Sequence, residues 1–377
     1  MSIDVKETEI QPALTGNKGE WSELYTLIYL LSTGRLESAD DNLECIEGAY
    51  FPILKIIRDD EKNNRHVSFN LATEEKMVRV YFNGVLKNEL SQESLGIKAG
   101  ELLTQIKNGK KEGAFSIEGA KELLSSLSCT KIKAPSTDKA DIHLYIHDYH
   151  NGMNIRSGFS IKSRLGHPST LFNASPATNF RYEICGTKEP MNDVIMNDVN
   201  SIETRTKIID RMNMLQRAGF DFVYDEPENI NFKTNLMLID SCLDKIFAEI
   251  IRISFKTGEL NLMKLVERLE QANPLNYPKP TVFYRYKIRK FLCAVALGMK
   301  PAKEWDGSEE ANGGYIIVKE DGDIVAFHIY NREFFENYLL KNTKLERAST
   351  TRHNFGSVYK NADRYFINFN LQIRFIQ

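Results

Sequence analysis

Cysteines are few in this chain and long apolar runs are missing, and both features restrict the class of protein. The five cysteines are widely spaced and odd in number, with no CxxC pair, so reduced thiols are expected rather than a disulfide framework. No stretch approaches the roughly 18 apolar residues of a membrane span. The first residues, MSIDVKETEIQPAL, are too polar for a signal peptide. We therefore expect a cytoplasmic protein with no membrane partner.

A strong net charge is also missing. The 49 Lys and Arg residues nearly balance the 51 Asp and Glu residues, so the chain as a whole is not a basic polyanion binder and any nucleic-acid surface must be a local patch. A hydrophobic content of 42% and a charged content of 27% are typical of a soluble globular protein. At about 100–200 residues per domain, 377 residues allow one large domain or two ordinary ones.

The most informative stretch runs from residue 141 to 162, DIHLYIHDYHNGMNIRSGFSIK, and predicts a β-hairpin. Asn151-Gly152 is a strong signal for a two-residue type I′ turn. With that turn, Asp141 lies opposite Lys162, with Cβ atoms roughly 5 Å apart. Ser160 shares their face because side chains alternate along a strand. An acid and a lysine on adjacent strands are what a metal-dependent phosphodiester nuclease needs.

This pair has a direct chemical interpretation. Mg²⁺ is usually held by one or two carboxylates together with water and phosphate oxygens, and Asp141 supplies one carboxylate. The Ile161 carbonyl is a further candidate ligand, and Lys162 could orient water or stabilise the transition state. The alternative is an ordinary surface ion pair. His143, His147 and His150 suggest zinc, but their spacing does not place all three on one strand face; His143 is expected to border the site.

The hairpin resembles the PD-(D/E)xK nuclease core, in which an Asp begins one strand and an acid-x-Lys triplet lies on the next. The triplet here is Ser160-Ile161-Lys162, so a second carboxylate must come from elsewhere. Lys18-Gly19-x-x-x-Glu23 resembles the first-helix motif of Holliday-junction resolvases, which implies Glu23 as a metal ligand. Glu20 is expected to close a capping box with Asn17, and Glu183 is a weaker candidate ligand.

The pattern of elements predicts an α/β fold with a mixed central sheet flanked by helices. A helix is expected over 18–33, ending at Gly34, and strands over 50–58, 66–71, 77–82, 180–185 and 365–377. We expect three parts: a nuclease core over 1–199, a helical insertion or subdomain over 200–272, and a C-terminal α/β part over 273–377 that carries DNA recognition and packs on the core. Within the insertion, one helix is expected over 236–255.

Three long strings then resemble the HpaII-type restriction endonucleases. They are GNKGEWSELYTLIYLLSTGRL (16–36), FSIKSRLGHPSTLFNASPATNF (159–180) and ERASTTRHNFGSVYKNADRYFINFNLQIRF (346–375). The resemblance implies a type II enzyme that cuts double-stranded DNA with Mg²⁺, partnered by a methyltransferase of the same restriction-modification system. The founding member recognises CCGG. A palindromic site favours a two-fold homodimer.

Two polar segments are candidates for reading DNA, because bases and phosphates are contacted by Arg, Lys, Asn, Gln, Ser and Thr. One leaves the hairpin and the other is a basic stretch near the C-terminus. The candidate residues are Arg164, Ser169, Thr170, Asn173, Asn179, Arg347, Thr350, Arg352 and His353. Arg352 and Arg347 are the leading candidates for guanine.

The sequence leaves two alternative functions open. One is a structure-specific repair or recombination nuclease that shares the first-helix glutamate. The other is a DNA-binding protein of the same fold that has lost catalysis, an idea that Ser160 motivates. Site-specific cleavage fragments would exclude both.

Overall fold

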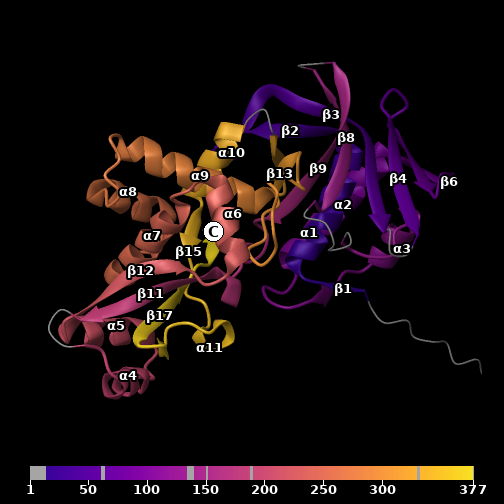
Figure 1. The fold of residues 1–377 in the computed structure, drawn as a ribbon. Coiled ribbons are helices and arrows are strands. Elements are labelled where there is room, and N and C mark those ends of the chain that lie inside the picture. Colours follow the sequence, from indigo (N-terminus) through magenta and orange to yellow (C-terminus); the bar gives the residue numbers. More distant parts are fainter. Residues whose placement is uncertain are drawn as a thin grey trace, which may run out of the picture. The chain divides into compact units, whose positions relative to one another are not determined.

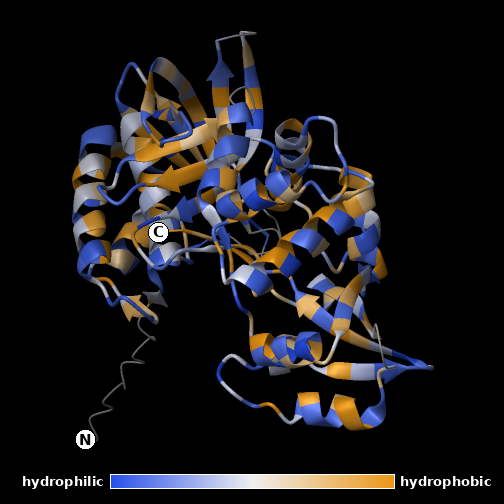
Figure 2. Cartoon of the chain, turned by 90° about the vertical axis from the view of Figure 1, so that its left-hand side faces the viewer, coloured by the Kyte–Doolittle hydropathy of each residue, from blue (hydrophilic) through white to orange (hydrophobic). Residues whose placement is uncertain are grey.

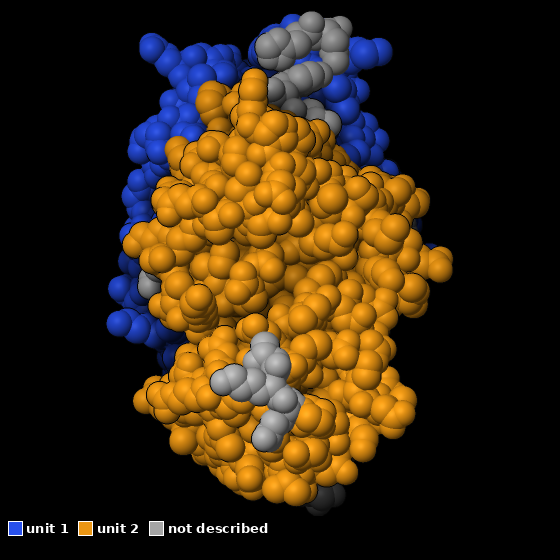
Figure 3. All heavy atoms as spheres, turned by 60° about the vertical axis from the view of Figure 1, so that its left-hand side comes forward, with its two compact units in different colours: residues 1–167, 312–329 blue, residues 168–311, 330–377 orange. Residues whose placement is uncertain are grey.

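A computed structural model describes residues 14–60, 64–133, 140–149, 152–186, 190–328 and 332–376. The chain folds into two compact units (Figures 1 and 3). Unit 1 comprises residues 1–167 and 312–329, and unit 2 comprises residues 168–311 and 330–377. Each unit is therefore assembled from two separate stretches of chain. The expected three-part division is a different partition and stays a prediction.

Unit 1 is built on a nine-stranded mixed sheet. Its strand order is β2 (Arg35–Ala39), β14 (Ile324–His328), β13 (Gly314–Val318), β9 (Met153–Ser163), β8 (Ile142–Asp148), β3 (Cys45–Asp60), β4 (Arg65–Ala72), β5 (Met77–Phe82) and β6 (Val85–Ser91). The β9–β13 and β2–β14 pairs are parallel and the other pairs are antiparallel. The predicted α/β class with a mixed central sheet is confirmed at this level.

Helix α1 (Lys18–Thr33) covers one face of this sheet and packs against α2 (Gln92–Asn108). Its predicted start and end are confirmed. Asn17 and Glu20 form the capping box, and Gly34 closes the helix with φ +68°, a conformation that glycine adopts without penalty. Trp21, Leu24 and Ile28 are fully buried. Figure 2 shows apolar and polar residues alternating along such helices, because only one stripe of each faces the core. Helix α3 (Ala120–Ser126) and a small β1 (Thr15–Gly16)–β7 (Phe115–Ser116) pair complete the unit.

The hairpin of β8 and β9 forms, but its predicted register is wrong by two residues. Asp148 pairs with Met153 and His143 with Gly158, so residues 149–152 separate the strands instead of a two-residue turn. Gly152 N donates to Asp148 O at 2.8 Å. His150 and Asn151 lie outside the described residues. A shift of two positions keeps every side chain on its predicted face, because the alternation also has a period of two. The predicted face was therefore correct and the predicted partner was not.

Unit 2 contains two antiparallel sheets and most of the helices. One sheet has the order β12 (Phe220–Pro227), β11 (Asn179–Gly186), β17 (Arg364–Asn370) and β16 (Val358–Asn361); the other has β10 (Thr170–Phe172), β18 (Ile373–Phe375) and β15 (Thr343–Leu345). The helices are α4 (Asp193–Asn200), α5 (Lys207–Arg217), α6 (Ile230–Ile239), α7 (Leu243–Thr257), α8 (Leu262–Ala272), α9 (Pro280–Leu297), α10 (Arg332–Lys341) and α11 (Thr350–His353). In the described part of the chain, no helix combines the length and apolar character that a bilayer crossing requires.

Two expectations for unit 2 are corrected. The segment 200–272 is not purely helical, because β12 adds a strand to β11, and the helix expected over 236–255 is broken at Asp240 into α6 and α7. The strand expected over 365–377 is split between β17 and β18, which belong to different sheets. In both places the apolar spacing resumes on each side of a short polar interruption, so the pattern of hydrophobicity alone did not reveal the break.

Candidate functional site

The start of β8 and the end of β9 bring together three of the predicted site residues. Ser160 Oγ donates to Asp141 Oδ2 at 3.0 Å, and Lys162 Nζ donates to Ser160 Oγ at 3.1 Å. Extending the β8–β9 register by one residue places Asp141 opposite Ser160 and one step along the face from Lys162. The serine thus lies between the acid and the lysine and bonds to both.

The Asp141 carboxylate is held in one orientation. Its Oδ2 accepts hydrogen bonds from Ser160 Oγ and from Ile161 N, the latter at 2.7 Å, while Asp141 N donates to Phe159 O at 2.8 Å. Among the described residues none donates a hydrogen bond to Oδ1. One carboxylate oxygen is therefore fixed by the hairpin, and the other remains available to a cation.

Ser160 holds Lys162 without neutralising it. The hydroxyl has one proton, which it gives to Asp141, and lone pairs that accept from the ammonium. Only 1% of the Ser160 surface is exposed. The ammonium of Lys162 also lies 5.3 Å from the centre of the Tyr315 ring, a cation–π contact. An acid at position 160 would instead pair its negative charge with the lysine.

The donor set fits Mg²⁺ through one carboxylate. In the described ranges no three His, Cys, Asp or Glu side chains come together as a ready metal cluster. Mg²⁺ does not require one, since it often takes one or two carboxylates and completes its shell with water and substrate phosphates. The Ile161 backbone N–H supports Asp141. The role of the Ile161 carbonyl as a ligand stays a prediction.

Glu20 has the capping role that the sequence predicted. Its carboxylate accepts from Asn17 N at 3.0 Å and pairs with Lys133 Nζ at 2.7 Å. Burial alone would raise the pKa of the Glu20 carboxyl, but the bonds from Lys133 and Asn17 lower it below its ordinary value. Glu23 is partly buried one turn further along α1, and its charge helps to raise the pKa of Lys133.

Glu23 approaches the sheet from the face opposite to the Ser160–Lys162 pair. Ser22 Oγ lies 2.8 Å from Ser163 Oγ, so α1 covers the face on which Ser163 lies. Ser160 and Lys162 are on the other face, because side chains alternate along β9. To share a metal with Asp141, Glu23 would have to reach around the end of the strand. Its assignment as a ligand stays a prediction.

Glu183 and Asp59 are the two other carboxylates to compare as sources of the second metal ligand. Glu183 lies on β11 in unit 2 and pairs with Arg364 Nη1 at 2.9 Å. Asp59 was not considered from the sequence. Ile57 pairs with His143 across β3 and β8, and two further steps along this register lead to Asp59 and Asp141. The Asp59 carboxylate lies 3.3 Å from His66 Nδ1. Only a long-range strand pairing could have revealed it.

His143 lies two residues after Asp141 on the same face of β8. It faces Gly158 across the hairpin. A Cβ on Gly158 would lie 2.9 Å from the Ala140 Cβ and 3.2 Å from the His143 ring, distances that leave no room for a side chain. Glycine at 158 therefore lets the histidine and the chain before Asp141 pack closely against β9.

In unit 2, a buried asparagine joins the two predicted DNA-reading segments. Asn179 Nδ2 donates to His353 O at 3.1 Å and to Asn354 O at 3.3 Å, and Asn179 Oδ1 accepts from Asn370 Nδ2 at 2.7 Å. Asn179 is 0% exposed. Its amide is bonded on both sides, so it does not present the free edge that base reading requires. It instead holds the turn after α11 against β11.

Arg347 is likewise anchored. Its guanidinium lies 3.8 Å from the centre of the Phe255 ring and donates to Ser254 Oγ at 3.0 Å. Desolvation lowers the pKa of Arg347 to about 10, so the side chain is still charged at neutral pH. These contacts tie the chain before α11 to α7 and leave Arg347 poorly placed to bind guanine in the present conformation.

Arg352 retains the features expected of a residue that reads DNA. It lies on α11, is exposed, and forms no ion pair or hydrogen bond through its guanidinium with the described residues. Thr350 and His353 are on the same short helix. Among the remaining candidates, Asn173 is exposed, Ser169 and Thr170 are partly buried around β10, and Arg164 is partly buried where the chain leaves β9.

Comparison with known proteins places the chain in a family. The model of the HpaII restriction endonuclease family matches residues 17–375. Over 364 residues the chain is 39% identical to the Type II restriction enzyme HpaII of Haemophilus parainfluenzae, covering 96% of this chain and 99% of that enzyme. No solved structure matches the chain. Similarity over nearly the whole of both chains includes the hairpin and the α11 region, and the chain belongs to the HpaII family of restriction endonucleases, enzymes that cut DNA.

Proposed function

We propose that this enzyme cuts double-stranded DNA at a short palindromic site by Mg²⁺-dependent hydrolysis, leaving 5′-phosphate ends. The observation that carries the proposal is the hydrogen-bonded chain from Asp141 through Ser160 to Lys162 at the end of one hairpin. CCGG, the site that the family implies, is the first candidate for the recognition sequence.

The hairpin residues have separate tasks in this proposal. Asp141 would hold Mg²⁺ through Oδ1, with Glu23 as the proposed second carboxylate. When bound, the ion would lower the pKa of a water and offset charge on the phosphate. Lys162 would donate to a phosphate oxygen or orient the attacking water. Ser160 would keep the ammonium in place while leaving its positive charge for the substrate.

Recognition is assigned to unit 2. Arg352 on α11 would donate two hydrogen bonds to guanine O6 and N7, the commonest specific contact in the major groove. Asn179 and Arg347 would hold this segment in position through the contacts described above. We further propose a cytoplasmic enzyme that works beside a methyltransferase protecting the host DNA, and that acts as a homodimer on its palindrome.

A plasmid digest with mapped ends tests the proposal. Purified enzyme with Mg²⁺ and unmethylated plasmid should yield discrete fragments whose ends share one short palindrome and carry 5′-phosphates. The same DNA methylated at that sequence should resist cleavage. Structure-dependent nicking without a common sequence would point to a repair nuclease. Binding without cutting, under the same conditions, would point to a DNA-binding protein without catalysis.

A further inference from the structure

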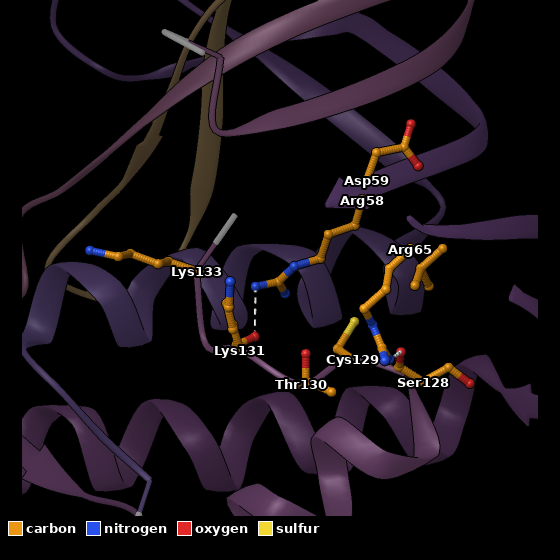
Figure 4. A pocket seen from close by; sticks show the side chains of 9 residues that line it. Arg58, Asp59, Arg65, Ser128, Cys129, Thr130, Lys131 and Lys133 are labelled. Carbon is orange, nitrogen blue, oxygen red and sulfur yellow. Dashed lines mark hydrogen bonds between the residues drawn. The ribbon is translucent and has the colours of Figure 1, made fainter. Parts of the chain in front are cut away.

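A second basic site lies in unit 1, beside the end of the hairpin that carries Asp141. Figure 4 shows a pocket between β3, β4 and the segment after α3. Its cavity volume is about 30 Å³, room for little more than one or two water molecules, so a ligand group would contact it from its open side. The basic side chains that line it are Arg58, Arg65, Lys131 and Lys133, with Asp59 as the acid.

The charge of this pocket is only partly offset. Lys133 is paired with Glu20, and the Asp59 carboxylate pairs with His66 and points away from the pocket in Figure 4. In the described part of the chain, neither Arg58 nor Arg65 forms an ion pair with a carboxylate. Within those ranges, both permanently charged guanidinium groups therefore lack a carboxylate partner.

Backbone carbonyls hold both guanidinium groups in position. Arg58 Nη2 donates to Lys131 O at 2.9 Å and to Ile132 O at 2.6 Å, and Arg65 Nη2 donates to Ser128 O at 3.2 Å. A carbonyl orients an arginine but leaves its net charge in place. Guanidinium groups have several donors in a rigid fork, which matches phosphate oxygens.

The partly buried thiol of Cys129 lies close to both arginines. Burial raises the pKa of Cys129, while Arg58 and Arg65 act in the opposite direction by favouring the thiolate. Both arginines therefore act on the same interior point. This positive charge would favour an anion at the open side of the pocket, and the guanidinium donors suit phosphate oxygens.

The pocket and the candidate active site lie at the same end of the β3–β8 pair. Ile57 faces His143; Arg58 follows Ile57 in β3, and Asp141 is two residues before His143, at about 3.3 Å per strand residue. Arg58 lies on the face covered by α1, since its neighbour across the sheet is the buried Val67. Ser160 and Lys162 lie on the opposite face of the sheet, so DNA would have to pass around this end of the sheet to contact both sites.

We propose that the Arg58–Arg65 pocket binds a backbone phosphodiester of the duplex DNA substrate and so holds the DNA at a second point beside the hairpin. This inference rests on the proposed function. The contact would be independent of base sequence, because phosphate contacts position a duplex without reading it. It would also explain how a protein with no overall positive charge grips a polyanion.

The test is the salt dependence of DNA binding, measured by fluorescence anisotropy. The probe is a duplex that carries the cleavage site, and metal is left out so that the duplex stays intact. Each phosphate contact contributes about 0.9 to the slope of log K against log salt. Arg65→Gln should bind about tenfold more weakly, with a slope shallower by about 0.9. Arg65→Lys should keep most of the slope. Arg79→Gln is the matched control, a half-exposed arginine of β5 paired with Glu75 and Glu89, and should bind as the wild type does.

Thr130→Glu gives a second arm in case Arg65→Gln fails to fold. Thr130 is exposed and lines the pocket, so the change adds a negative charge and leaves both arginines and their carbonyl partners intact. It should weaken binding, whereas Thr104→Glu on the exposed side of α2 should not.

Three outcomes would overturn the inference while leaving the proposed function standing. The first is wild-type affinity and salt slope in folded Arg65→Gln and Thr130→Glu. The second is an equal loss in the control variants. The third is a loss confined to DNA with a free 5′-phosphate end, which would assign the pocket to product ends. A wild type that neither binds nor cuts duplex DNA would instead contradict the proposed function itself.

Discussion

The hairpin of unit 1 and the α11 region of unit 2 are assembled in opposite ways. Asp141, Ser160 and Lys162 lie within one supersecondary element and make their contacts through neighbouring strands. The α11 region is held by Asn179, which is 174 residues away in the chain from His353, whose carbonyl accepts its hydrogen bond. A site within one hairpin can be predicted from local sequence, whereas a site held by distant partners cannot.

The two regions also have different expected roles: catalysis for the hairpin, and positioning of the DNA-reading segment for the α11 region. The hairpin leaves Asp141 Oδ1 and the Lys162 ammonium available for substrate, so changes there should affect cleavage before stability. The Asn179 network leaves no free polar edge and is buried, so changes there should affect stability and recognition. Variants in the two regions can test whether this separation holds.

The largest effect is expected from Lys162→Ala. If Lys162 has the proposed role, loss of the ammonium removes a donor to the developing charge, which typically costs about 10²–10³ in rate. Cleavage should fall at least about 100-fold, while metal-free binding of the specific duplex should change little. Lys55→Ala is the control, since Lys55 lies on β3 over the Tyr145 ring. Full cleavage by Lys162→Ala would show that the hairpin is not part of the active site.

Asp141→Asn and Glu23→Gln test the metal ligands together. Asp141→Asn should lose Mg²⁺-dependent cleavage almost completely, because the amide cannot replace the carboxylate charge. Glu23→Gln should lose about 10–100-fold if Glu23 is the second ligand, as supporting groups at metal sites typically do. Titration of Mg²⁺ against cleavage rate gives the measurement. Wild-type activity in Glu23→Gln would show that another residue supplies the second carboxylate. Asp59→Asn is then the next variant to measure.

Arg352→Ala should act on recognition alone. A bidentate arginine–guanine contact contributes about 1–3 kcal/mol of discrimination, so specific binding should weaken by about 10–100-fold. Thermal stability should remain near that of the wild type, because Arg352 is exposed on α11. Arg347→Ala should show the reverse, with stability lost through the Phe255 and Ser254 contacts. Equal binding losses in both variants would contradict the distinction between them.

Asn179→Ala should destabilise unit 2. Several buried donors and acceptors would lose a partner, at about 1–3 kcal/mol for a buried group left unsatisfied. Urea unfolding would measure the change in free energy, with the exposed Asn173→Ala as the matched control. Cleavage by the folded fraction should persist if the hairpin acts independently. An unchanged unfolding free energy would show that the Asn179 network is not a support.

The smallest effect is expected from Glu20→Gln at the start of α1. Because the folded pKa of Glu20 lies below its ordinary 4.5, ionised Glu20 stabilises the folded state above that pH. The contribution is lost as pH falls through the folded value. Glu20→Gln should therefore cost about 0.5–2 kcal/mol at pH 7, the range for helix caps, and less at pH 3. Glu93→Gln, in the first turn of α2, is the control in urea unfolding at both pH values.

The sequence predicted local structure well where one signal dominated. The capping box and Gly34 placed α1, and the alternation of apolar residues placed β3, β4, β5 and β11. It failed where the apolar spacing resumed on both sides of a break, as at Asp240 and between β17 and β18. The hairpin shows the limit most clearly: Asn151-Gly152 predicted a tight turn, but strand pairing with β3 and β13 sets the register.

For the candidate site, local sequence was sufficient to place Asp141, Ser160 and Lys162 on one face of the hairpin. A shift of two residues preserves that face, so the three side chains still lie together in the observed register. It was not sufficient for Asn179 and Arg347, whose predicted contact with bases depended on their being exposed. Their distant partners, Asn370 and Phe255, engage them instead.

The sequence by itself determined the family, the α/β class, the first helix and the set of side chains on one face of the hairpin. Those features depend on motifs and on contacts between near neighbours. Tertiary structure alone decided which residue faces Asp141, which asparagine supports α11, and that Arg58 and Arg65 converge on one pocket. The physical reason is that register and burial are set by pairing between strands and segments far apart in the chain, and a local pattern carries no record of those partners.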